Sequence, residues 1–125
     1  MDKKLLEDFG KSLMQNVRDY AAEEYLKMKS GQMKSERSKE MTKAINSFNQ
    51  DQIEKLDFVV GRMIDNVIHK VLFNFETSDN FTIAAKENID EVHDIVAYSD
   101  GICGELYLED GWYQMFSKNL LNVQW

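Results

Sequence analysis

Apolar residues recur every three or four positions from residue 52 to residue 75, and this repeat constrains the fold more than any other feature. One row is formed by Ile53, Leu56, Val60, Met63, Val67, Val71 and Phe75, and it is widened by Val59, Ile64, Ile68 and Leu72. The spacing predicts an α-helix with a broad buried face, roughly 36 Å long at 1.5 Å per residue. Asp51 and Glu54 form an acidic variant of a capping box at its start. We expect this helix to be the spine of the core.

Two further helices are predicted before it. Residues 3–29 form the longer one, whose apolar face holds Leu6, Leu13, Val17, Ala21 and Met28. Gly10 falls near that face, where a missing side chain lets another backbone approach. After a polar, serine-rich connection, residues 35–48 predict a short helix. The fold class is therefore predominantly α.

The last fifty residues give weaker signals. Residues 81–86 have the composition of a short strand, and Asn88 with Glu91 resembles a capping box, which favours a helix over 89–99. Asp110 and Gly111 lie between two aromatic runs, which predicts a small antiparallel hairpin near 103–117. Residues 112–120 also fit helical spacing, so an all-α protein is the alternative to this α+β fold.

The second half of the chain carries the net charge. Residues 1–75 hold thirteen basic and twelve acidic side chains, whereas residues 76–125 hold two basic and ten acidic ones, and the chain's net charge is −7. Binding to nucleic acid needs a basic face for the phosphates, and an anionic membrane surface attracts basic segments. The charge therefore argues against both kinds of partner.

Composition indicates one folded domain, residues 1–125, with a helical body at 1–75 and an acidic, aromatic-rich half at 76–125. Apolar residues make up 43% of the chain and charged residues 30%, which is ordinary for a globular protein. The single cysteine, Cys103, excludes an internal disulfide and fits a reducing compartment. The sequence has no apolar run typical of a secretion signal or a membrane span. We expect a cytoplasmic protein.

Aromatic and acidic residues interleave near the end of the chain. This combination is typical of binding surfaces, where aromatics anchor the partner and charges steer it. The predicted partner-binding residues are Tyr98, Asp100, Glu105, Tyr107, Glu109, Asp110, Trp112, Tyr113 and Phe116. The opposing interpretation places the aromatics in the core and leaves the carboxylates solvated, and the sequence does not decide between the two.

Catalytic motifs are missing from the sequence, and we expect no catalytic residue, metal or cofactor. Asp90, His93 and Asp94 would share one face of the predicted 89–99 helix, but a stable metal site needs three or four ligands and no HExxH motif or histidine pair is present. His69, one helical turn after Asp65, fits a pair on the polar surface of the central helix. Cys103 fits a small buried residue among acids.

These observations favour a non-enzymatic protein-binding module that blocks a basic protein, such as a toxin or a nucleic-acid-binding protein. By type alone, a small acidic domain of this kind is similar to bacterial immunity proteins and other inhibitors of basic toxins. The alternatives are a structural or regulatory homo-oligomer, with a homodimer formed through the long helices, and, with less support, a metal-dependent hydrolase.

Overall fold

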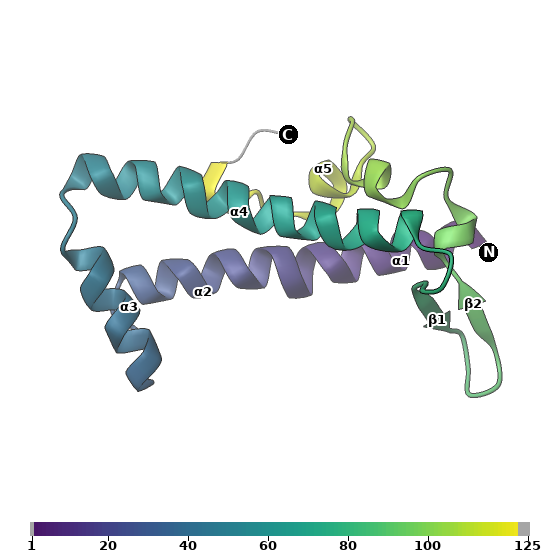
Figure 1. Ribbon diagram of the computed structural model, residues 1–125, viewed down its shortest axis with the longest axis horizontal. Helices are drawn as coiled ribbons and strands as arrows, with labels where there is room; N and C mark the ends of the chain where they lie inside the picture. Colours follow the sequence, from purple (N-terminus) through teal and green to yellow (C-terminus); the bar gives the residue numbers. More distant parts are fainter. Residues whose placement is uncertain (1, 123–125) are drawn as a thin grey trace.

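Two long antiparallel helical segments form the body of the molecule (Figure 1). The structure is a computed structural model, and it describes residues 2–122. The first segment is continuous and consists of α1 (Asp2–Leu13), the π-helical turn η1 (Met14–Arg18) and α2 (Asp19–Lys29). A short helix, α3 (Glu36–Asn46), lies at one end, and α4 (Gln50–Thr77) returns alongside the first segment. The predicted helices at 3–29, 35–48 and 52–75 are confirmed.

The start of α4 differs in detail from the prediction. Asn49 is the N-cap: its side chain accepts a hydrogen bond from the Gln52 N–H, and the Gln52 side chain accepts one from the Asn49 N–H. This reciprocal pair satisfies two N–H groups that a helix start leaves open. The capping box predicted at Asp51 and Glu54 is therefore wrong by two residues.

The helix predicted over 89–99 is wrong. Its place is taken by an antiparallel hairpin of β1 (Ala84–Lys86) and β2 (Val92–Asp94), followed by the 3-10 turn η2 (Val96–Tyr98). The Asn88 side chain does accept hydrogen bonds from the N–H groups of Asp90 and Glu91. An Asx turn and a helix N-cap use the same kind of hydrogen bond, so this signal fits either structure.

The hairpin predicted near 103–117 is also wrong. Two short helical pieces occupy this stretch, the 3-10 helix η3 (Ile102–Leu106) and the α-helix α5 (Trp112–Phe116), and the 3-10 turn η4 (Leu120–Asn122) follows. The preferred two-residue hairpin turn of an Asp-Gly pair needs positive φ at both residues, whereas Gly111 has a φ of −77° and is the N-cap of α5. The overall class, predominantly α with a small antiparallel hairpin, is confirmed, and the all-α alternative is wrong.

The main core lies where the segment after α4 packs on the two long helices. The helices contribute Leu6, Met14, Ile68 and Leu72, and the later segment contributes Ile102, Leu106, Trp112 and Tyr113. Gly10 is buried beneath Trp112, and a Cβ atom at position 10 would clash with the indole ring. The close approach predicted at Gly10 is made by a side chain, the Trp112 ring, and not by another backbone. Among residues 2–122, none of the helices combines the length and apolar character needed to cross a membrane.

Candidate functional site: an acidic groove

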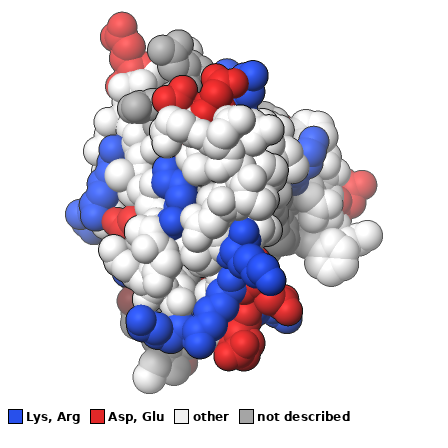
Figure 2. Space-filling model, turned by 90° about the vertical axis from the view of Figure 1, so that its left-hand side faces the viewer, with Lys and Arg blue, Asp and Glu red and all other residues white. Residues whose placement is uncertain are grey.

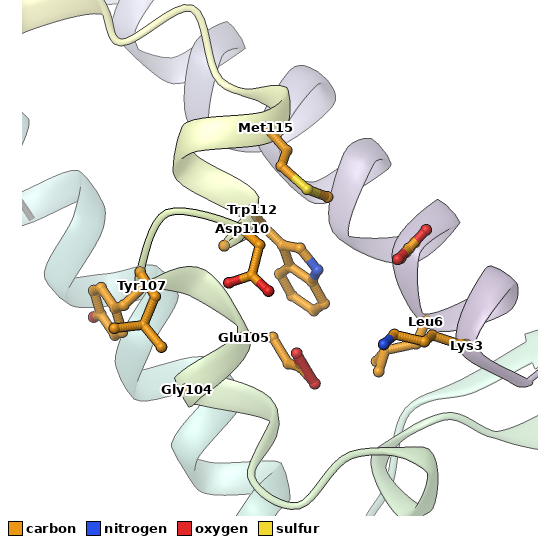
Figure 3. A pocket seen from close by; sticks show the side chains of 11 residues that line it. Lys3, Leu6, Gly104, Glu105, Tyr107, Asp110, Trp112 and Met115 are labelled. Carbon is orange, nitrogen blue, oxygen red and sulfur yellow. The ribbon is translucent and has the colours of Figure 1, made fainter.

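A groove lies between the first turns of α1 and residues 104–115 (Figure 3). Its volume is about 270 Å³. The residues that line it are Lys3, Leu6, Glu7, Gly104, Glu105, Tyr107, Leu108, Asp110, Gly111, Trp112 and Met115. Two parts of the chain that are about one hundred residues apart therefore meet here.

Trp112 forms the floor of this groove and is itself part of the core. Its side chain is only 2% exposed, and its ring packs edge-on against Phe9 with the ring centroids 5.8 Å apart. The next residue, Tyr113, is 1% exposed and packs against Tyr107 on the inner side. Burial raises the pKa of the Tyr113 phenol, and the nearby Asp65 carboxylate raises it further. Both side chains are core residues in this structure.

Carboxylates surround the indole ring. Figure 3 shows Glu105 and Asp110 on the side of η3 and α5, with Lys3 and Leu6 opposite them on α1. Glu7 also lines the groove. Glu105 is held in place because it accepts a hydrogen bond of 2.7 Å from the Ser99 hydroxyl, whereas Asp110 is exposed. With three carboxylates and one ammonium group, the lining favours a cationic group above an apolar floor.

Leu108 lies on an exposed loop at the edge of the groove. This side chain is 80% exposed and has a φ of +76°. The left-handed conformation costs a residue with a Cβ atom about 1–2 kcal/mol, and an exposed leucine gains little from burial in return. Glu109 and Asp110 follow it directly. The loop therefore holds an apolar side chain out to solvent next to two carboxylates, and such strain is concentrated at functional sites.

The structure brings together four of the nine predicted partner-binding residues: Glu105, Tyr107, Asp110 and Trp112 line the groove. Tyr107 is half-buried, and its hydroxyl lies 2.7 Å from Nδ1 of His69. Residues Leu6, Glu7 and Met115 were not predicted. Two helices that are distant in sequence, α1 and α5, supply them, and one-dimensional spacing does not reveal such a pairing.

The remaining predicted residues lie elsewhere. Tyr98 is directed to the β-hairpin, where its hydroxyl lies 2.8 Å from Nδ1 of His93. Phe116 is half-buried against the core, and Tyr113 is buried in it. Asp100 and Glu109 are exposed outside the groove lining. Glu109 is nevertheless adjacent to Leu108 on the exposed loop.

A different set of possible metal ligands gathers at the β-hairpin. Glu87, Glu91 and His93 offer ligand atoms within 4.8 Å of one another. His93 Nε2 lies 2.9 Å from a Glu87 carboxylate oxygen, and its Nδ1 is paired with Tyr98. The predicted set of Asp90, His93 and Asp94 required a helix, which is not formed. The cluster is largely exposed, and its geometry is explained by hydrogen bonds of the hairpin.

Asp65 and His69 do not form the predicted surface pair. Asp65 is 6% exposed and accepts a hydrogen bond of 3.1 Å from Nε of Arg18, which is fully buried. Asp19, 2% exposed, lies beside Arg18 and accepts hydrogen bonds from the Ser117 hydroxyl and the Lys118 N–H. These contacts tie residues 117 and 118 to the long helices, so we assign them a structural role.

Cys103 shows no sign of nucleophilic activation. Its thiol and its N–H both donate hydrogen bonds to a Glu76 carboxylate oxygen, at 3.2 and 3.1 Å. Burial raises the pKa of the thiol, and the Glu76 carboxylate raises it further. The thiolate is the nucleophilic form, so this environment suppresses reactivity.

Comparisons with protein-family models, with curated proteins and with solved structures found no match, so the geometry of the groove and its loop carries the functional argument.

Proposed function

We propose that this chain is a protein-binding module whose acidic groove receives a basic segment of a partner protein. The observation that carries this proposal is the strained, 80% exposed Leu108 beside a groove lined by Glu7, Glu105 and Asp110. A lysine or arginine side chain above Trp112 would pair with the carboxylates. An apolar residue next to it would cover Leu108.

The size of the groove fits a single side chain of a partner protein better than a small-molecule substrate. Its volume of about 270 Å³ is just below the range typical of small-molecule sites. The net charge of the segment after residue 75 would speed the approach of a basic partner, and salt would screen this attraction.

Blocking is the mode of action that we propose. The module would occupy a basic surface that the partner needs for its own ligand, in the manner of an inhibitor or immunity protein. The long helices keep the groove rigid, which lowers the entropy cost of binding. We place this encounter in the cytoplasm, because the single cysteine fits a reducing compartment.

The test is affinity capture from the native cell with three versions of the protein. The groove variant carries Glu105→Gln and Asp110→Asn, and the matched control carries Asp90→Asn and Glu91→Gln on the exposed hairpin turn. Both lose two negative charges. We expect a basic protein to be retained by the wild type and the control, and to be reduced at least tenfold with the groove variant and at 0.5 M salt.

Equal capture by the groove variant and the control would contradict the groove as the binding site. A captured protein that is acidic, or whose capture is insensitive to salt, would contradict the electrostatic mechanism. Circular dichroism of both variants verifies that they keep the helical fold.

A further inference from the structure

An apolar ridge runs along α4 on the side away from η3. It consists of Val59, Met63, Val67 and Val71, which recur every four residues and lie on one side of the helix. Their side chains are 51%, 53%, 54% and 48% exposed. We call these four residues the α4 ridge.

The other side of α4 is occupied. His69 contacts Tyr107, and Glu76 contacts Cys103 in η3. Ile68 and Leu72 are buried in the core. The segment after α4 therefore covers one side of this helix, while the α4 ridge leaves an apolar face only half-covered.

The molecule exposes more surface than a compact monomer of its mass. The chain exposes 8579 Å² at a mass of 14.6 kDa. A compact monomer of this mass exposes about 6,900 Å², which leaves an excess of roughly 1,700 Å². A standard interface buries about 800 Å² on each partner, which is less than this excess.

Charge is distributed unevenly along the molecule. Residues 27–43, around α3, carry six basic and two acidic side chains, whereas residues 76–125 carry two basic and ten acidic ones. Figure 2 looks onto the α3 end and shows lysine and arginine side chains spread across it, with carboxylates mainly toward the edges. Figure 1 places the acidic segment toward the opposite end of α4. The molecule thus has one basic end and one acidic end.

We propose that a second copy of this chain docks on the α4 ridge in antiparallel orientation. A twofold axis across α4 between Met63 and Val67 would place Val59 of each copy against Val71 of the other. The basic α3 end of one copy then lies beside the acidic end of its partner, and an apolar seam is flanked by complementary charge. The groove lies on other elements, so this inference does not depend on the proposed function.

Sedimentation velocity from 1 to 200 µM tests the assembly. The wild type should sediment as a dimer of about twice 14.6 kDa. Met63→Lys places a charge in the centre of the seam, and we expect a dissociation constant at least 30-fold higher. The matched control is Ile89→Lys, which changes an apolar side chain that is 94% exposed on the hairpin. A wild type that stays monomeric at 200 µM, or a Met63→Lys dimer as stable as the control, overturns the proposal.

Disulfide crosslinking tests the orientation in a Cys103→Ser background. An equimolar mixture of Val59→Cys and Val71→Cys proteins should form a crosslinked dimer, whereas each protein alone should not. Crosslinking of each protein with itself would indicate a parallel arrangement and overturn the antiparallel seam. Circular dichroism verifies that each variant is folded. We expect the ridge variants to fold even as monomers, because the α4 ridge is exposed in the single chain.

Discussion

The helical body, residues 2–77, and the segment 78–122 contribute differently to the same structure. The body has nearly all of the regular helix and sets the length of the molecule (Figure 1). The segment has short pieces of three to five residues, yet it supplies half of the buried residues of the main core. A segment with little regular secondary structure therefore contributes as many buried residues to the main core as the long helices do.

This division also separates the two roles of the acidic segment. Its apolar residues, such as Ile102 and Trp112, are directed inward onto the helices. Its carboxylates and Leu108 are directed outward. One stretch of sequence therefore holds the body together with one set of side chains and presents a candidate binding surface with the other.

The largest effect is expected for Trp112→Ala. Removing this buried ring leaves a cavity beside Phe9 and Gly10, and we expect a loss of about 3–5 kcal/mol in the free energy of unfolding in urea. The control is Met115→Ala, which also lies in α5 but is 44% exposed, and here we expect a loss of less than about 1 kcal/mol. Equal losses would mean that the segment does not support the core through its indole ring.

The buried ion pair comes next. Asp65→Asn removes one of the two carboxylates beside the buried Arg18, and we expect a loss of about 3 kcal/mol. The exposed Asp79 is the matched control, and Asp79→Asn should leave the urea midpoint unchanged. An Asp65→Asn protein as stable as this control would contradict a structural role for the pair.

A smaller effect tests how the body accommodates the segment. Gly10→Ala places a Cβ atom against the Trp112 ring, and we expect a loss of about 1–3 kcal/mol although alanine favours helix more than glycine does. Gly104→Ala is the control, because a Cβ atom there meets no heavy atom within 4 Å. Thermal unfolding of the pair measures the difference. A Gly10→Ala protein more stable than the wild type would show that the indole ring is not seated on α1 as described.

The smallest effect concerns Cys103, where η3 meets the end of α4. Burial and the Glu76 carboxylate raise the pKa of the thiol, so the pH profile of its alkylation should have its midpoint above that of an unperturbed cysteine. Glu76→Gln should move the midpoint downward part of the way, because burial remains. A midpoint at or below the ordinary value would contradict the contact.

The long helices were predictable from sequence because a repeat of 3.6 residues over twenty or more positions has few competing explanations. The fold of residues 78–122 was not predictable, because their local signals fit a turn and a helix start equally well. The Asn88 side chain accepts the same kind of backbone hydrogen bond in a turn that it would accept as a helix N-cap. Gly111 is the N-cap of a short helix and does not form a hairpin turn. Asp65 was predicted on the polar surface of the central helix, and only its tertiary contact with Arg18 makes it part of a buried pair.

Four of the eleven residues that line the groove were predicted from sequence. Composition indicated the acidic residues Glu105 and Asp110 as part of a binding surface. The contribution of α1 was hidden, because the pairing of Leu6 and Glu7 with residues 104–115 depends on the fold. Leu108 carried no signal at all, since its exposure and its positive φ are properties of the loop conformation.

The measurement that tests the account most directly is Leu108→Gly, assayed for both urea stability and capture of the basic partner. Glycine tolerates the left-handed conformation, so stability should be unchanged or higher by up to about 1 kcal/mol. Capture should fall at least tenfold, while Ile89→Gly on the exposed hairpin turn leaves it unchanged. Retained capture together with a loss of stability would contradict the account, because Leu108 would then be a structural residue and not a binding one.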